Sequence, residues 1–371
     1  MNFCISRARA PAPHFVGDTI EGDTNQTLEP ITHFLTGACL GRSGFNRKTA
    51  LATATMTLAA EAPDLDVLGS LKGPVFGFAH HRGFTHSFLG LALVSAAVVG
   101  FMYGVWRLRG RKTQDPNLAP RWGLLFLLAY LAGLSHILLD FTNNYGVRPF
   151  WPFVEKWYSW DIVFIWDPYI FVALILGLVL PSLFGLINEE VGARQRGPRG
   201  RLAAALALIA VASWWGVRDY EHRRAVNALE ARTYENLDPL RASAYPSWWT
   251  PVQWQGVIET QNFFADMLVD SLTPEVDPGG QMQIHYKPEE TPATLAAKRS
   301  YLGRAYLDWA AYPLVEAEHH DSPGGGYTVH FLDLRFSGMA PRGRTPLTSS
   351  VELDENLNVI SEGGVPKSKI P

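Results

Sequence analysis

Long apolar segments between residues 88 and 217 constrain this 371-residue chain more than any other feature. A hydrocarbon layer of about 30 Å is crossed by roughly 17 to 25 helical residues, so such segments predict membrane-spanning helices. The four strong candidates are residues 88–106, 122–139, 162–187 and 202–217. Two weaker segments, 32–45 and 49–68, predict a helical hairpin that enters the membrane halfway or crosses it twice. In both cases the chain returns to the side from which it came, so the sides predicted for the later loops do not change.

Basic residues between these segments predict the side that each loop occupies, because short loops rich in Lys and Arg stay in the cytoplasm. Such loops follow the first and the third strong segment, and their residues are Arg107, Arg109, Arg111, Lys112, Arg121, Arg194, Arg196, Arg199 and Arg201. Alternation then places residues 69–87, 140–161 and the chain after 217 on the outer side. We therefore expect a multi-pass protein of a bacterial-type inner membrane, with its C-terminal part in the periplasm.

After residue 217 the composition changes to that of a soluble domain. We expect a mainly α protein in which residues 30–217 form a polytopic membrane helical bundle, 218–240 a charged linker helix, and 241–371 a small α+β soluble domain. In that domain Thr291 and Pro292 predict the start of a helix that runs to about residue 312. Strands are predicted at 281–286, 327–337 and 350–360, and the polar residues 1–29 predict a disordered extension.

Composition excludes some classes of protein. The net charge is -3, and the basic residues lie beside apolar segments, so we expect no nucleic-acid partner. The two cysteines, Cys4 and Cys39, have no metal-ligand spacing and predict no disulfide framework.

Candidate metal ligands gather at the outer ends of the predicted spans. They are His33, Asp64, Asp66, His80, His81, His86, His136, Asp140, Asp161 and Asp167. The predicted membrane topology brings residues more than 100 positions apart to the same side of the membrane. The pattern therefore predicts one metal site on the outer face.

His136 and Asp140 are four residues apart in a predicted helix, so their side chains leave one face about a turn apart and can bind one ion. A histidine capped by a structural carboxylate is the alternative interpretation. In the segment 80–87, Gly83 lets the loop fold back so that His81 and His86 can face one centre. Histidines that only sit in the polar interface are the alternative there.

Asp64 and Asp66 follow a predicted helix on a turn suited to bridging or flanking hard cations, although solvated loop acids are equally common. Arg82 offers a planar fork for a phosphate or carboxylate. Asp167 lies inside a predicted span, where an acid is costly unless it is paired or metal-bound. Capping of the helix that begins at Pro168 is the competing interpretation.

Four motifs resemble those of the inner-membrane metal-dependent hydrolase family, which is distantly similar to zinc-dependent phospholipase C. They are Ile-Thr-His at 31–33, Pro-Asp-Leu-Asp at 63–66, His-Arg-Gly-Phe-Thr-His-Ser at 81–87 and His-x-x-x-Asp at 136–140. The resemblance implies a helical site with divalent metal, zinc by analogy, and about two or three ions. The ligands that it implies are His33, Asp64, His81, His86, His136 and Asp140.

These features together predict a metal-dependent hydrolase that attacks a phosphodiester or other ester of a lipid or envelope-derived substrate with metal-activated water. Asp64 is the predicted bridging carboxylate, Asp66 supports the ligands or acts as the general base, and Arg82 binds the substrate anion. The alternative is a non-catalytic metal-binding membrane protein or an ion transporter. Transport sites lie near the middle of the bilayer on broken helices, whereas these ligands lie at the outer ends.

Overall fold

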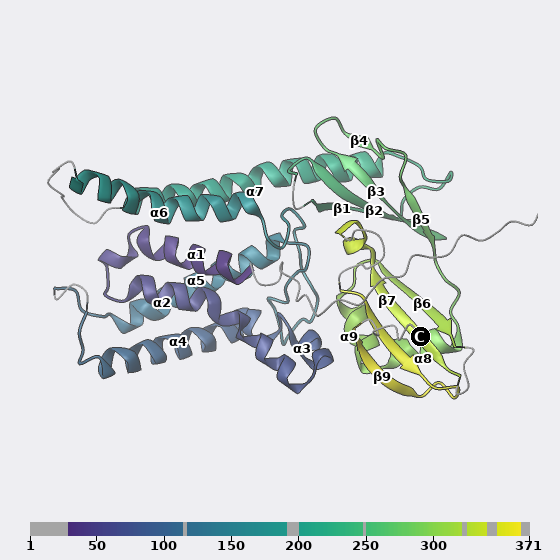
Figure 1. The fold of residues 1–371 in the computed structure, drawn as a ribbon, viewed down its shortest axis with the longest axis horizontal. Coiled ribbons are helices and arrows are strands. Elements are labelled where there is room, and N and C mark those ends of the chain that lie inside the picture. Colours follow the sequence, from purple (N-terminus) through teal and green to yellow (C-terminus); the bar gives the residue numbers. More distant parts are fainter. Residues whose placement is uncertain are drawn as a thin grey trace, which may run out of the picture.

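The computed structural model describes residues 29–113, 117–190, 200–247, 250–320, 325–339 and 347–364. A helical domain and a β-rich tail domain lie end to end, and one long helix runs along both (Figure 1). Nearly all of the predicted N-terminal extension, residues 1–28, lies outside the described residues.

The predicted apolar segments form the long helices of the helical domain. They are α4 (Phe88–Leu108), α5 (Trp122–Thr142), α6 (Pro168–Glu190) and α7 (Arg201–Glu230). Among the described residues, α4, α5 and α7 are long and apolar enough to cross a membrane, and the apolar part of α6, Pro168–Pro181, is shorter. The third predicted segment starts six residues before its helix, because Asp167 accepts hydrogen bonds from the backbone N–H groups of Tyr169 and Ile170 and so caps α6 at its start.

The weaker N-terminal segments form a hairpin of two short helices, α1 (Glu29–Arg42) and α2 (Ala52–Glu61). Small residues let these helices approach closely: a Cβ on Gly37 would lie 2.6 Å from the carbonyl oxygen of Met56. Helix α2 also packs against α5, so the hairpin is held on the rest of the helical domain. Past α2 the chain forms the 3-10 helix η2 (Ala62–Lys72), α3 (Pro74–His80) and the 3-10 turn η3 (Phe84–His86) at the end nearest the tail domain.

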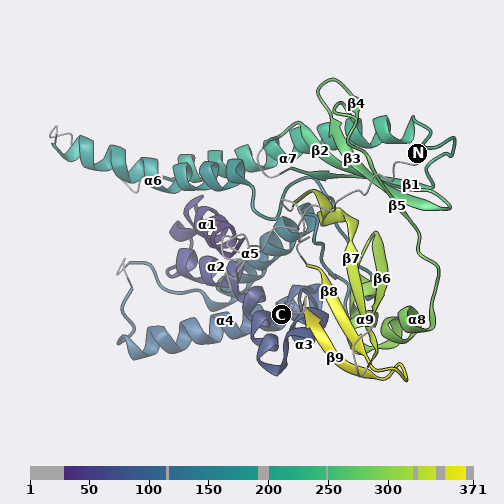
Figure 2. The ribbon, with the colours of Figure 1, turned by 45° about the vertical axis from the view of Figure 1, so that its right-hand side comes forward.

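Helix α7 continues without a break through the predicted boundary between the fourth span and the linker. Its last turns carry Ala225 and Leu229, which are buried against Trp254 in the core of the tail domain. Figure 2 shows α7 lying along the first sheet of that domain.

The described residues of the tail domain form two antiparallel sheets, with two helices between them in sequence. The first sheet holds β1 (Arg241–Pro246), β2 (Gln253–Glu259), β3 (Phe263–Asp270), β4 (Glu275–Val276) and β5 (Gln283–Tyr286). The second follows α8 (Pro292–Arg299) and α9 (Tyr301–Trp309) and holds β6 (Pro313–His319), β7 (Tyr327–Asp333), β8 (Ser349–Leu353) and β9 (Val359–Gly364).

Local capping and turn chemistry explains where the tail domain differs from its prediction. Thr291 caps α8 as expected, but Ser300 accepts a hydrogen bond from the backbone N–H of Gly303 and starts a second helix, so the predicted single helix is two. The predicted strand 350–360 is a hairpin of β8 and β9, and its turn holds Leu357 at a φ of 65°. The predicted strand 327–337 ends at Asp333, where a 3-10 turn begins.

Candidate metal centre

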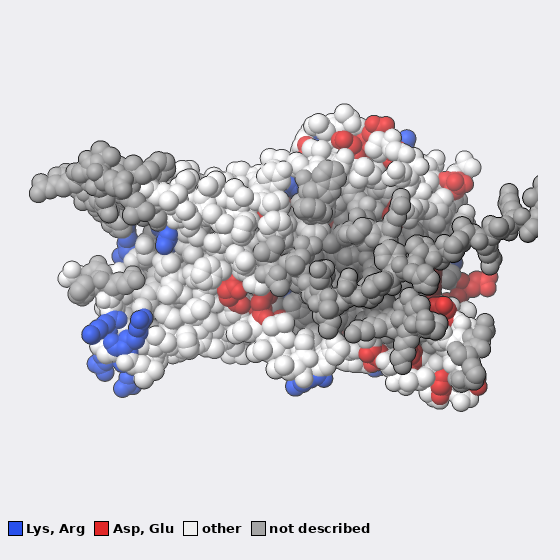
Figure 3. All heavy atoms as spheres, viewed as in Figure 1, with Lys and Arg blue, Asp and Glu red and all other residues white. Residues whose placement is uncertain are grey.

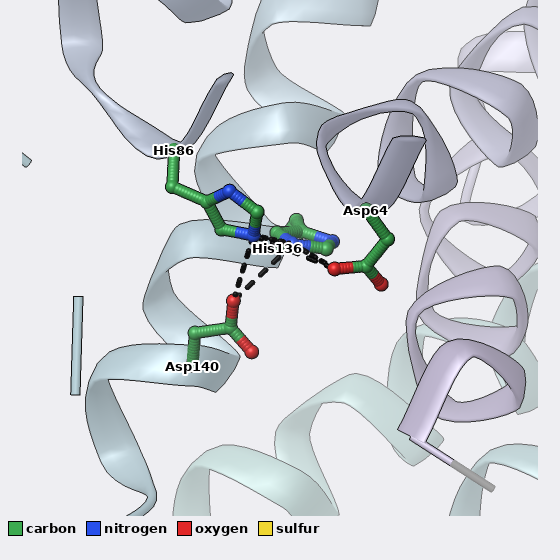
Figure 4. A group of neighbouring side chains, drawn as sticks. All are labelled: Asp64, His86, His136 and Asp140. Carbon is green, nitrogen blue, oxygen red and sulfur yellow. Dashed lines mark hydrogen bonds and ion pairs between the residues drawn. The ribbon is translucent and has the colours of Figure 1, made fainter. Parts of the chain in front are cut away.

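Four of the predicted ligands converge at the end of the helical domain that faces the tail domain. Asp64 comes from η2, His86 from η3, and His136 and Asp140 from successive turns of α5. One ligand atom from each lies within 4.8 Å of the others, and the side chains point toward one another (Figure 4). The two histidines and Asp140 are fully buried, whereas Asp64 is partly exposed.

The separations between these ligand atoms fit a single bound ion. Oδ2 of Asp140 lies 3.3 Å from Nε2 of His86 and 3.2 Å from Nε2 of His136. Oδ1 of Asp64 lies 3.4 and 3.5 Å from the same two nitrogens. Ligands about 2.1 Å from a tetrahedral zinc ion are about 3.4 Å apart, so the donor set matches such a site.

A second layer of contacts orients both histidines. Nδ1 of His136 lies 2.7 Å from the carbonyl oxygen of Ala60, so this nitrogen donates its proton there and Nε2 is the ring nitrogen that faces Asp64 and Asp140. Nδ1 of His86 lies 3.4 Å from Oδ2 of Asp66 and 3.0 Å from the Thr85 hydroxyl. Such partners are a regular feature of metal-binding histidines.

The charge of the site also favours a cation. Burial by itself would raise the pKa of Asp64, yet the neighbouring His136 and His86 hold that pKa well below its ordinary value. Burial likewise opposes ionisation of Asp66, but His81 and His86 lower its pKa. Both carboxylates in η2 therefore stay negative and available to a metal ion or to its ligands.

His33 and His81 lie outside this group of four. Nε2 of His33 lies 3.4 Å from Oδ1 of Asp140, and its ring stacks on His136 with centroids 3.8 Å apart. A small cavity of about 20 Å³, large enough for one water-sized group, borders His33 and Asp140. His81 is further away: its Nδ1 contacts Asp66 at 3.1 Å, and its ring centroid is 6.0 Å from that of His86.

Arg82 lies beside the centre but is held by other groups. Its guanidinium is 3.0 Å from Oδ1 of Asp140 and donates to Oδ1 of Asn143 and to the carbonyl oxygen of Gly146, both at 3.2 Å. The side chain is 1% exposed. The geometry therefore makes Arg82 a support for Asp140, in contrast to the predicted contact with a substrate anion.

The remaining acids and His80 serve elsewhere. Asp167 caps α6 and accepts a hydrogen bond from Trp214, which is the competing interpretation of the sequence. Asp161 is half-buried and lies within the electrostatic reach of Arg335 of the tail domain. His80 stacks on Phe76 and is not among the ligand atoms that converge.

Glu61 was missed by sequence reasoning. Its carboxylate accepts a hydrogen bond from the backbone of Phe34 and interacts electrostatically with Asp64 and His136. Its Oε1 is buried without a hydrogen-bond partner among the described residues. The available signal was its position three residues before Asp64, which places both acids on one side of the helix end.

Comparisons with known proteins agree with a membrane protein. Residues 28–225, more than half of the chain, match the family described as YdjM inner membrane protein. The chain is also 24% identical over 343 residues to the uncharacterized protein YfhP of Bacillus subtilis (strain 168), covering 90% of this chain and 94% of that protein. No solved structure matches the chain. The predicted membrane location is thus confirmed, and the chain belongs to the YdjM inner membrane protein family.

Proposed function

We propose that this protein is a membrane-bound metal-dependent hydrolase that cleaves a phosphodiester or other ester of a lipid or envelope-derived substrate. The observation that carries the proposal is the convergence of Asp64, His86, His136 and Asp140 at distances suited to one ion. A bound divalent ion such as zinc lowers the pKa of water toward neutrality and stabilises negative charge that develops on a substrate oxygen.

The chain's own residues have distinct roles in this proposal. Asp64 is partly exposed and so is the ligand nearest to an entering substrate. Asp66 holds His81 and His86, which supports the predicted role in orienting ligands. His33, beside the second oxygen of Asp140 and a cavity, offers a donor for a further ion.

The distribution of basic residues supports a periplasmic site. Arg107, Arg109 and Arg111 lie at the end of α4 that is remote from His86, which sits just before its start. Figure 3 shows Lys and Arg atoms gathered at the end of the helical domain that is farthest from the tail domain. Since basic loops stay in the cytoplasm, a multi-pass arrangement would place the metal centre and the tail domain outside.

Exposed apolar side chains on η2, on η3, at the start of α4 and in the loop after α5 support a lipid substrate. Leu71 on η2 is 86% exposed and Phe153 in the loop after α5 is 82% exposed. We name this surface the apolar collar, and its residues are Leu65, Val67, Leu68, Leu71, Phe84, Phe88, Phe150 and Phe153. Contact between the Phe88 and Phe150 rings, 5.5 Å apart, joins the loop to α4, whose exposed apolar face continues the collar. Exposed apolar side chains of this kind are typical of contact with lipid, which fits a substrate that carries an acyl chain.

Hydrolysis by the purified, metal-loaded protein tests the proposal. Bis(p-nitrophenyl) phosphate serves as a generic phosphodiester and a long-chain phospholipid in mixed micelles as the lipid substrate. We expect cleavage, with preference for the lipid, and loss of both metal and activity in His136→Ala and Asp140→Ala. His285→Ala is the matched control, because His285 pairs with Asp266 in the tail domain at 2.6 Å and lies away from the cluster.

Full activity in both ligand variants would contradict the proposed site. Stoichiometric metal binding without hydrolysis of either substrate would favour the alternative, a membrane protein that binds metal without catalysis.

A further inference from the structure

The tail domain binds the loop that follows α5. This loop begins shortly after Asp140, one of the proposed ligands. Nε1 of Trp309 donates to the carbonyl oxygen of Tyr145 at 3.1 Å, and Nη1 of Arg335 donates to the carbonyl oxygen of Asn144 at 3.0 Å. All four residues are buried. The ring of Tyr145 is itself a member of the tail domain's core, 5.0 Å from the ring of Trp309.

The other side of the same loop holds Arg82. The side-chain oxygen of Asn143 accepts hydrogen bonds from the backbone N–H of Tyr145 at 2.9 Å and from Arg82 at 3.2 Å. The carbonyl oxygen of Gly146 also accepts from Arg82, whose guanidinium stacks over the Tyr145 ring at 4.8 Å. Arg82 in turn pairs with Asp140 at 3.0 Å. A continuous set of buried contacts therefore links the tail domain to a ligand.

At the tail-domain end of this set, several contacts hold Arg335 in place. Nε and Nη2 of Arg335 both lie 2.8 Å from Oδ2 of Asp333, and Nη2 also donates to the carbonyl oxygen of Trp309. The guanidinium stacks on the Trp309 ring at 4.4 Å. Because Arg335 uses several donors of its planar fork at once, a lysine cannot reproduce its contacts.

We propose that Trp309 and Arg335 are positioning residues of the metal centre, which they serve by holding the backbone of Asn144 and Tyr145. This fixes Asn143 and Gly146, which orient Arg82, and Arg82 sets the carboxylate of Asp140. The inference rests on the proposed metal centre and adds that the centre is complete only when the tail domain is docked. The tail domain thus acts as a structural support of the site, although none of its described residues is among the converging ligands.

Removal of one hydrogen bond at this contact should change the metal centre at a distance. Partners that orient metal ligands typically change metal affinity by about 10- to 100-fold, and Trp309 and Arg335 act on such a partner, Arg82, through the loop, so we expect the lower end, about tenfold. Trp309→Phe is the sharpest variant, because it keeps an aromatic ring in the core while it removes the indole N–H that donates to the carbonyl oxygen of Tyr145, together with part of the ring's packing. Arg335→Lys keeps the positive charge but lacks the planar guanidinium group and its several donors.

Trp254→Phe is the matched control. Trp254 is also a buried tail-domain tryptophan whose Nε1 donates one hydrogen bond at 3.1 Å, to the Ser271 hydroxyl, and it has no contact with residues 143–148 among its described contacts. Both tryptophan variants therefore lose similar packing and one similar bond, but only Trp309→Phe loosens the loop.

The experiment is a titration of the full chain in detergent with Co²⁺. The visible absorption of the bound ion monitors the titration. The visible band reports ligand geometry and does not depend on turnover. We expect Trp309→Phe and Arg335→Lys to weaken Co²⁺ binding about tenfold and to shift the band. Trp254→Phe should match the wild type in both respects.

Two outcomes overturn the inference and are distinguishable. If the wild type binds Co²⁺ and Trp309→Phe has the affinity and spectrum of Trp254→Phe, the positioning role is wrong while the metal centre stands. If the wild type binds neither Co²⁺ nor any other divalent ion in the same titration, the proposed metal centre is wrong, and this inference is wrong with it.

Discussion

Individual side chains around His86 and His136 divide into ligands and groups that orient ligands. Asp66 belongs to the second kind, because its two oxygens contact Nδ1 of His81 and Nδ1 of His86 and also accept the backbone N–H of Arg82 at 2.7 Å. These contacts fix the ring of His86 so that Nε2 faces Asp64 and Asp140. The proposed metal centre is thus expected to depend on a carboxylate that is not itself among the four converging residues.

Substitution of Asp66 by asparagine tests that dependence. Asp66→Asn keeps the shape but removes the charge that supports His86, so we expect metal affinity to fall by about 10- to 100-fold. Competition with a chromogenic chelator measures the change. Asp270→Asn, which alters a carboxylate that caps an exposed turn in the tail domain, should leave the affinity unchanged. Equal affinities in the two variants would refute the role given to Asp66.

The environment of Asp161 predicts that the free energy of unfolding changes with pH. Burial raises the pKa of Asp161 from 3.8 to about 6, while its hydrogen bond with Ser159 and the nearby Arg335 act in the opposite direction. Between these two values the folded protein binds more protons than the unfolded chain, so the contribution of this group to stability falls as pH rises from about 4 to about 6 and then stays low.

An asparagine at position 161 cannot ionise, so the Asp161→Asn variant should not lose stability as the pH rises. Above about pH 6 we expect the variant to exceed the wild type by on the order of 2 kcal/mol, with a smaller difference near pH 4. Thermal unfolding midpoints of the detergent-solubilised proteins at about pH 4.5 and about pH 8 provide the comparison. A difference that is the same at both pH values would contradict the assignment.

Among the elements, the close approach of α1 to α2 has a direct consequence for the site. Gly37 is near the middle of α1, and a Cβ there would also lie 2.8 Å from the Cβ of Ala60. Ala60 is the residue whose carbonyl oxygen accepts from His136, and α1 carries His33. The spacing of these two helices therefore sets how the stacked rings of His33 and His136 meet.

Gly37→Val should force the hairpin apart. We expect a loss of about 1–3 kcal/mol in the free energy of unfolding, as in other overpacked sites, together with weaker metal binding. Gly104→Val is the control, since the Cβ position of Gly104 in α4 has no atom within 4 Å. Chemical unfolding followed by circular dichroism, with a parallel metal titration, distinguishes the two. Equal stability of both variants would show that the α1–α2 contact adjusts freely.

For the whole molecule, the proposed orientation makes a clear prediction. Alkaline phosphatase is active only when it is exported, so a fusion after β9 should be active and a fusion within residues 109–113 should be inactive. Immunoblots of both fusions control for expression. The reverse pattern of activity would place the metal centre and the tail domain in the cytoplasm and would contradict the orientation inferred from the basic residues.

Features that depend on neighbouring residues could be read from the sequence. The apolar segments identify their helices because hydropathy is a local property, and His136 and Asp140 share a face because helix periodicity alone brings them together. Local signals also placed Thr291 at a helix start, and Ser300, inside the predicted helix, caps a second one by the same chemistry. The sides on which the loops lie placed Asp64 and His86 on the same face as that pair, and the family resemblance implied them as ligands.

Only the tertiary structure decided which atoms meet. The contact of Arg335 with Asn144 joins residues 191 positions apart, and no periodicity or composition predicts such a pair. Likewise, Arg82 has the chemistry to bind a substrate anion, but burial against Asp140 and Asn143 gives it a structural role. The reason is physical: a side chain's local sequence limits what it can bind, whereas the packing of distant elements determines which partners lie within hydrogen-bond distance.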